Sequence, residues 1–209
     1  MQGGSESVEA HVVIKNIYCL EGDWSGNPRR PSTVRPIFDL LAQAHPALRY
    51  VHRSIGTREE FDHALESWTR RKHADFPILY LAFHGDERVL FVGDRRRRRG
   101  RVTLEAIAER LEGRCADRLI HFGSCRTLKT PRESLREFLA QTGALAVSGY
   151  REEINWLVSA GFEVQLLGAM QEASLDLRGA RRTVERVRRV ARPIARELGF
   201  RMETRSARG

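Results

Sequence analysis

The sequence predicts an α/β protein, specifically a three-layer α/β/α sandwich with a mainly parallel sheet. Short apolar runs alternate along the chain with segments whose apolar residues recur at helical spacing. We find no internal repeat and no stretch long enough to be a linker between domains. Because strand–helix–strand connections within one sheet are nearly always right-handed, this alternation favours a parallel sheet with helices on both faces.

The expected strands are short and rich in β-branched or aromatic residues. The run PILYLAF at 77–83 is apolar throughout, which is typical of a strand covered on both faces. The segment at 48–55 instead alternates apolar and polar residues, as a half-buried strand does. The segment at 89–93 is expected to form one arm of a small hairpin. In chain order, the expected strands cover residues 11–19, 48–55, 77–83, 89–93, 118–122 and 144–148.

The expected helices carry capping residues or an apolar stripe. The run from Thr57 to Glu60 matches a capping box, and Thr103 is a second N-cap. Pro36 falls in the first turn of its helix, where proline is tolerated. Pro193 falls late in the basic C-terminal helix and is expected to kink or end it. The expected helices cover residues 34–45, 57–73, 103–111, 134–141, 162–172 and about 180–198.

One domain is expected over residues 11–198, between a flexible N-terminus at 1–10 and a tail at 199–209. A chain of 209 residues can form one sizeable core, and 41% hydrophobic with 30% charged residues is typical of a soluble globular protein. The arginine-rich loop at 94–101 is expected at the tip of the hairpin. Its five adjacent arginines repel one another and are stable only when solvated.

The net charge of +9 comes almost wholly from arginine, because the chain has only three lysines. We attribute this bias to a GC-rich genome more than to a nucleic-acid partner, although a basic surface does raise the affinity for polyanions. No apolar run is long enough for a membrane helix, and the N-terminus lacks the pattern of a secretion signal. We therefore expect a cytoplasmic protein with no membrane contact.

The three cysteines predict neither a disulfide framework nor a zinc site. Cys19, Cys115 and Cys125 are odd in number and widely spaced, with no CxxC pair among them. No metal and no cofactor is expected. Cys19 is either core packing or a second thiol near the site discussed next.

Two of the expected strands end in reactive side chains. The run PILYLAF leads directly into His84, and the run RLIHF leads into Gly123, Ser124 and Cys125. If these strands are neighbours, the two side chains emerge at the same edge of the sheet, where ligand sites of parallel sheets lie. An imidazole that takes the thiol proton would make Cys125 a nucleophile. Backbone N–H groups of Gly85 and Cys125 would form an oxyanion hole.

The order strand, His-Gly, hairpin, capped helix, strand, small residue and Cys resembles the clan of caspases, gingipains, separases and bacterial CHAT-domain peptidases. The resemblance covers residues 11–170 and implies a caspase-like sheet in a small bacterial member. It assigns Cys125 as nucleophile, His84 as general base and Gly85 as oxyanion donor of a cysteine endopeptidase with an acyl-enzyme intermediate. It also implies a protein or peptide substrate, a separate activator protein and a place in a bacterial defence or stress pathway.

The chain departs from this clan in two places that concern substrate binding. Gly123 and Ser124 replace the Gln-Ala that precedes the cysteine of caspases, and Ser124 is a candidate substrate contact. The loop after the first strand carries Glu21 and Asp23, where caspases carry an arginine. We therefore expect a preference for Arg or Lys before the cut, with Glu21 or Asp23 as counter-ion. The alternative is that both acidic residues only cap a turn.

Other functions have less support in the sequence. Pro131 stands where a cysteine phosphatase needs arginine, and no phosphate-binding loop or dinucleotide fingerprint is present. The remaining alternatives are a catalytically inactive caspase-like binding module and a basic regulator that binds nucleic acid through the arginine-rich loop and the last helix. The oligomeric state is left open.

Overall fold

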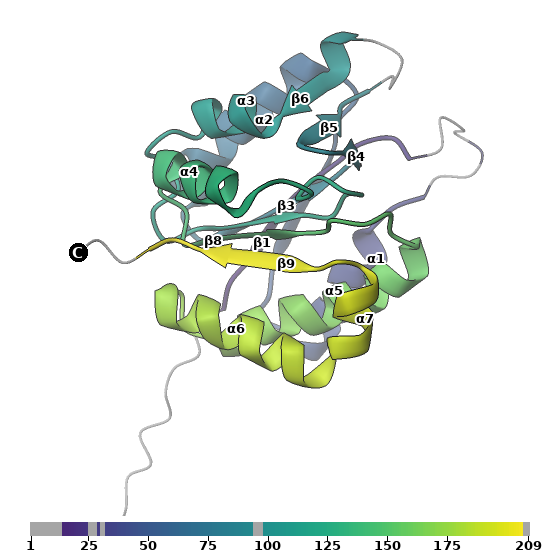
Figure 1. The fold of residues 1–209 in the computed structure, drawn as a ribbon, viewed down its shortest axis with the longest axis vertical. Helices are drawn as coiled ribbons and strands as arrows, with labels where there is room; N and C mark the ends of the chain where they lie inside the picture. The colour runs from purple at the N-terminus through teal and green to yellow at the C-terminus, as the bar shows by residue number, and fades with distance from the viewer. Residues whose placement is uncertain (1–13, 25–28, 30–31, 94–97, 207–209) are drawn as a thin grey trace, which may run out of the picture.

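The computed structural model describes residues 14–24, 29, 32–93 and 98–206. A central sheet lies between two layers of helices, as Figure 1 shows. The α/β prediction and its three-layer arrangement are therefore confirmed. The predictions for the N-terminus at 1–10 and for residues 94–97 of the arginine-rich loop lie outside the described residues.

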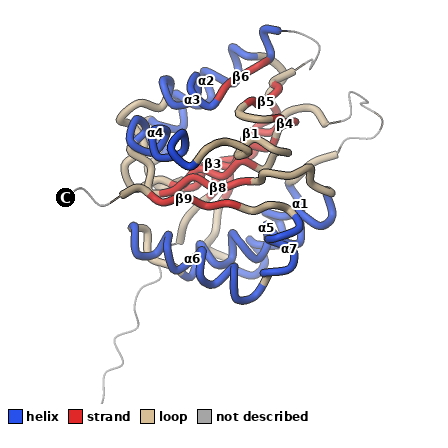
Figure 2. Tube along the Cα trace, viewed as in Figure 1, coloured by secondary structure: helices blue, strands red, loops and turns tan. Residues whose placement is uncertain are grey.

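The central sheet has six strands in the order β2-β1-β3-β7-β8-β9. The first five are parallel to one another, and β9 runs antiparallel to β8. In Figure 2 these strands form the red middle layer between blue helices. Their bounds are β1 Ile17–Glu21, β2 Tyr50–Ser54, β3 Ile78–Ala82, β7 Leu119–Phe122, β8 Ala146–Gly149 and β9 Arg201–Thr204.

The register brings the carboxyl ends of the central strands level with one another. Glu21 of β1 lies beside Ala82 of β3, and Leu81 of β3 lies beside Phe122 of β7. The chain segments that follow β1, β3 and β7 therefore leave the sheet at one edge. This is the edge where parallel sheets place their ligand sites.

Two hydrophobic cores occupy the two faces of the sheet. Leu79 and Leu81 of β3 pack against α2, α3 and α4, whereas Ile78 and Tyr80 face α1, α5 and α6. This alternation explains why the run at 77–83 is apolar throughout, since successive side chains of a strand point to opposite faces. The helices are α1 Arg35–Ala44, α2 Arg58–Thr69, α3 Leu104–Arg110, α4 Arg132–Thr142, α5 Trp156–Glu172, α6 Leu177–Val190 and α7 Arg192–Glu197.

A small antiparallel sheet follows β3 and lies on the side of α2 and α3 (Figure 1). It contains β4 His84–Asp86, β5 Val89–Phe91 and β6 Arg101–Thr103, in that order. The sequence predicted only one arm of this hairpin. β6 leads directly into α3, whose N-cap Thr103 accepts a hydrogen bond from Ala106 N at 3.2 Å.

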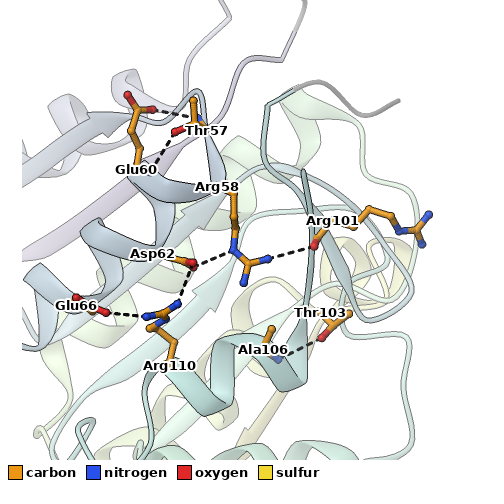
Figure 3. Close-up of polar contacts among 9 residues, drawn as sticks. All are labelled: Thr57, Arg58, Glu60, Asp62, Glu66, Arg101, Thr103, Ala106 and Arg110. Atoms are coloured by element: carbon orange, nitrogen blue, oxygen red, sulfur yellow. Dashed lines mark hydrogen bonds and ion pairs between the residues drawn. The ribbon is translucent and has the colours of Figure 1, made fainter. Parts of the chain in front are cut away.

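Ion pairs fix α3 against α2, and a hydrogen bond joins β6 to α2, as Figure 3 shows. Arg110 of α3 binds Asp62 at 3.1 Å and Glu66 at 2.8 Å, both on α2. Arg58 binds Asp62 at 3.0 Å and also donates to the carbonyl oxygen of Arg101 at 3.4 Å. The predicted capping box at Thr57 is present. These contacts hold the small sheet beside the strand ends.

Several boundaries differ from the sequence-based prediction. The strand expected at 11–19 is β1 Ile17–Glu21, and the helix expected at 57–73 ends at Thr69 and is followed by a short 3-10 helix at Arg71–His73. The segment expected to be a tail at 199–209 contains β9, which pairs with β8 and closes that side of the sheet. The helix expected at 162–172 begins earlier, at Trp156, because Asn155 caps it and accepts from Leu157 N at 3.0 Å. The helix expected at about 180–198 is divided into α6 and α7 just before Pro193, which fits the break predicted there.

Candidate active site

His84 and Cys125 lie on the wall of one pocket at the carboxyl edge of the sheet. β3 ends at Ala82, two residues before His84, and β7 ends at Phe122, three residues before Cys125. The pocket has a volume of about 150 Å³ and is lined by both side chains. The strand order therefore delivers a thiol and an imidazole to a common site.

The His84 ring is oriented by the loop that follows β1. Its Nε2 lies 2.8 Å from the carbonyl oxygen of Trp24, and the Trp24 ring meets the His84 ring edge-on at 5.2 Å. A carbonyl oxygen only accepts hydrogen bonds, so Nε2 carries the proton in this contact. The neutral ring then keeps the lone pair of Nδ1, which is the atom able to accept a proton from a thiol.

Trp24 is held in turn by the buried carboxylate of Glu21. Trp24 Nε1 donates to Glu21 Oε1 at 2.6 Å, and Val34 N donates to the same oxygen at 2.8 Å. Thr33 Oγ1 donates to Oε2 at 2.6 Å, and His52 Nε2 contacts Oε2 at 2.5 Å. Glu21 therefore fixes the loop that orients His84.

These contacts also determine the ionisation of Glu21. Burial alone would raise its pKa, but the hydrogen bonds from His52, Thr33 and Trp24 outweigh burial and hold the pKa below its usual value. Glu21 is buried and does not line the pocket of Cys125 and His84. Its expected role as a substrate counter-ion stays a prediction. Asp23 lies exposed on the same loop, and its role stays a prediction.

The turn that carries Cys125 is built from hydroxyl groups and backbone contacts. Ser124 Oγ lies 2.8 Å from Thr127 Oγ1, which in turn donates to the carbonyl oxygen of Cys125 at 3.2 Å. Ser124 is completely buried and does not line the pocket, so the structure shows it shaping the turn. Its expected role as a substrate contact stays a prediction.

Arg126, directly after Cys125, is in the left-handed backbone region with φ of 55°. A non-glycine residue adopts this conformation only when its surroundings enforce it. Here the backbone N–H of Arg126 donates to Glu152 O at 3.1 Å, and its guanidinium binds Glu87 at 2.8 Å. The position of Cys125 is thus fixed from both sides of the pocket.

Gly85 lets β4 pack against the Cys125 turn. A Cβ at this position would lie 2.6 Å from the carbonyl oxygen of Cys125 and closer still to Thr127 Oγ1. Any larger residue therefore pushes the turn away. Gly85 was predicted only as an oxyanion donor, and the structure gives it a packing role as well. Its N–H as an oxyanion donor stays a prediction.

Only one of the three thiols is accessible. Cys19 and Cys115 are fully buried, and Cys125 is partly exposed. Burial raises the pKa of Cys115 to about 12. Burial, followed by the charges of Glu21 and Glu163, raises the pKa of Cys19 well above its usual value. Cys19 packs in the core beside Tyr80 and is therefore unsuited to be a second nucleophile.

Sequence reasoning missed much of the pocket wall. Trp24 and Trp156 provide aromatic surface, while Tyr80 and Glu163 provide the polar groups. Asn155 before Trp156 was a usable signal for an earlier start of α5. The other contributions depend on how α1 and α5 pack below the sheet, which no local pattern reveals. The remaining lining residues are Val34, Ile37, Gly123, Ile154, Ser159 and Ala160.

The fold and pocket define a three-layer α/β/α protein with a cysteine and a histidine at the carboxyl edge of a mainly parallel sheet. The chain belongs to the family described as "Family of unknown function (DUF6642)", whose model matches residues 14–203. No curated protein matches the chain. Within the described part of the chain, no helix combines the length and apolar character needed to cross a membrane. The same residues contain no group of three His, Cys, Asp or Glu side chains placed to hold a metal ion.

Thiol accessibility gives a first prediction. In the native protein, iodoacetamide is expected to modify one thiol, and the Cys125→Ala variant is expected to show no modification. Cys19 and Cys115 should react only after denaturation, because burial keeps both thiols protonated and out of contact with the reagent. Intact-protein mass spectrometry counts the adducts. Modification of Cys19 at the rate of Cys125 would contradict the described core.

The packing of Gly85 gives a second prediction. Gly85→Ala is expected to lower the free energy of unfolding by about 1–3 kcal/mol, because the new methyl group overlaps the Cys125 turn. The control is Gly168→Ala in α5, where a Cβ meets nothing within 4 Å and helix propensity favours alanine by up to about 1 kcal/mol. Urea unfolding measures both. An equal response of the two variants would show that Gly85 is not closely packed.

Proposed function

We propose that this protein is a cysteine endopeptidase in which Cys125 is the nucleophile and His84 is the general base. The observation that carries the proposal is the shared pocket of Cys125 and His84, with His84 Nε2 bound to the Trp24 carbonyl. A nucleophile, a base and a group that orients the base are the parts this chemistry needs.

The first half of the proposed reaction forms an acyl-enzyme. His84 Nδ1 takes the thiol proton, and the Cys125 sulfur attacks the carbonyl carbon of the scissile peptide bond. The carbonyl oxygen becomes an oxyanion, for which the N–H groups of Gly85 and Cys125 are the predicted donors. When the intermediate collapses, the C–N bond breaks and His84 gives its proton to the leaving amine. A thioester on Cys125 remains.

The second half releases the product and restores the thiol. His84 takes a proton from water, and the resulting hydroxide attacks the thioester carbon. The C–S bond then breaks, the carboxylic acid leaves, and the proton returns to the Cys125 sulfur. The same imidazole moves each proton and is protonated during both halves of the reaction. The hydrogen bond from His84 Nε2 to the Trp24 carbonyl stabilises this protonated ring.

A peptide library tests the proposal. The full chain is expected to cleave members of the library, and Cys125→Ala is expected to abolish cleavage. His84→Ala should lower kcat/KM by roughly 100-fold or more, because general base catalysis contributes roughly 100- to 10,000-fold. His63→Ala is the matched control, since His63 is exposed on α2, away from the pocket.

Alkylation of the thiol gives a readout that does not depend on turnover. The rate of Cys125 alkylation near neutral pH is expected to fall in His84→Ala and to stay unchanged in His63→Ala, because only His84 shares the pocket. Equal rates in all three proteins, together with an uncleaved library, would refute the cysteine peptidase.

A second candidate function is nucleic-acid binding, and a different surface favours it. A hollow of about 680 Å³ on the α6–α7 side is lined by several arginines and by no acidic residue. Glu203 binds Arg132 at 2.9 Å next to it, whereas Arg188, Arg192 and Arg196 lie exposed at the surface. Guanidinium groups suit the phosphate backbone. The arginines that line this hollow are Arg132, Arg151, Arg188, Arg192, Arg196 and Arg201.

Salt dependence tests the second candidate. The R188A/R192A/R196A variant is expected to bind a short RNA or DNA oligonucleotide more weakly and to lower the slope of log affinity against log salt by about 2–3. The control R70A/R71A/K72A removes the same charge from the α2 side of the sheet. Fluorescence anisotropy measures both. If the two variants lose equal affinity, the binding reflects net charge and not the arginine hollow.

A further inference from the structure

The pocket of Cys125 and His84 contains a carboxylate that the proposed chemistry does not use. Glu163 of α5 lines this pocket although it is only 2% exposed. A buried carboxylate is retained only when hydrogen bonds or an opposite charge compensate it. The groups that compensate Glu163 therefore show whether its carboxylate is still able to bind a ligand.

Those partners use one oxygen of the carboxylate. Tyr150 donates its hydroxyl to Glu163 Oε1 at 3.0 Å, and His121 Nε2 lies 3.5 Å from the same oxygen. His121 is itself fixed by Ser148 Oγ, 2.9 Å from its Nδ1. Both contacts are made to Oε1, so the second oxygen, Oε2, is not engaged by Tyr150 or His121. The carboxylate is thus held in place from one side and keeps an acceptor for a ligand.

A second polar group in the pocket is also unpaired. Tyr80 lines the pocket, and its buried hydroxyl lies near the Glu163 carboxylate but has no partner in hydrogen-bond geometry in the described part of the chain. Buried hydroxyls are normally bonded, so this one marks a place where a polar ligand group is expected. A Cβ on Gly123 would lie 2.6 Å from Tyr80 Oη, which places that hydroxyl just below the strand end that leads to Cys125.

Electrostatics keeps the Tyr80 hydroxyl neutral. Burial, followed by the nearby Glu163 carboxylate, raises the pKa of Tyr80 well above its usual value. The oxygen of a protonated phenol accepts a hydrogen bond from an ammonium or guanidinium N–H. Glu163 and Tyr80 together therefore provide a charged and a neutral acceptor.

The rest of the wall suits the stem of a long basic side chain. Trp24 and Trp156 present aromatic surface, and Trp156 remains 47% exposed. Lys and Arg pack their methylene groups on such apolar walls while the charged end reaches polar groups. A volume of about 150 Å³ is below that of an ordinary small-molecule site and suits one side chain. The aliphatic part of the wall comprises Val34, Ile37, Ile154 and Ala160.

We propose that this pocket binds the Arg or Lys side chain immediately before the scissile bond, with Glu163 as its counter-ion. The inference rests on the proposed peptidase, because the residue before the cut must lie next to the Cys125 sulfur. In this proposal the counter-ion is Glu163 of α5, whereas the sequence predicted Glu21 or Asp23 of the loop after β1. An Asp or Glu side chain in this pocket would meet the like charge of Glu163 and be rejected.

Active-site-directed probes test the inference on the full chain. Four peptidyl acyloxymethyl ketones of one sequence, ending in Arg, Lys, norleucine or Asp, are compared by their rates of Cys125 labelling in intact-protein mass spectrometry. The Arg or Lys probe is expected to react at least roughly 10-fold faster than the norleucine probe, and the Asp probe is expected to be the slowest. Glu163→Gln should slow the basic probes by roughly 30-fold and leave the norleucine probe unchanged.

Two further variants separate specificity from folding. Glu172→Gln is the matched control, because Glu172 is on the same helix but binds Arg186 at the surface, 2.6 Å away. Tyr80→Phe removes only the unpaired hydroxyl and is expected to slow the basic probes several-fold. It remains informative if Glu163→Gln does not fold.

The outcomes distinguish this inference from the proposed function. Fastest labelling by the Asp or norleucine probe would overturn the inference and leave the peptidase standing. So would a basic preference that survives both Glu163→Gln and Tyr80→Phe. Failure of all four probes, with iodoacetamide alkylation that does not depend on His84, would overturn the peptidase itself.

Discussion

The parallel pairing of β3 with β7 is the constraint on which the site depends. Because Leu81 lies level with Phe122, both strands end at the same height, and the segments that follow them carry His84 and Cys125 to one pocket. A shift of one residue in this register would exchange the two faces of the sheet. Leu81 would then lose its core under α2, and Tyr80 would leave the pocket. The burial that specifies the register thus also brings the thiol and the imidazole to one pocket.

The elements that sequence patterns predicted are those whose signals are local. The apolar run at 77–83 and the capping box at Thr57 depend on neighbouring residues, so they could be recognised without the fold. β9 could not, because Arg201–Thr204 has charged and polar residues at an outer strand and owes its conformation to pairing with β8. Its hydrogen bonds join residues more than fifty positions apart in the chain, beyond the reach of periodicity.

The residues of the candidate site also divide into those with a local sequence signal and those without one. His84 and Cys125 were predictable because each follows directly on a strand of obvious character. The roles of Glu21 and Glu163 were not, because both are decided by partners from distant segments. Glu21 is bound by Thr33, Val34 and His52, so a carboxylate that looked available in the sequence holds the loop that contacts His84. Glu163 looked like an ordinary helical residue, yet packing turns it toward the pocket.

The segment between β8 and α5 connects two surfaces that otherwise lie apart. Arg151 N donates to Gly199 O at 3.2 Å, next to the arginine hollow, and Glu152 O accepts from Arg126 N at 3.1 Å, next to the thiol. Gly199 packs so tightly on Glu152 that a Cβ would approach the Glu152 side chain to 2.8 Å. The adjacent residues Arg151 and Glu152 therefore contact one of these two surfaces each. Gly199 thus supports, through Arg151 and Glu152, the turn that carries Cys125, although the two positions lie far apart in the chain.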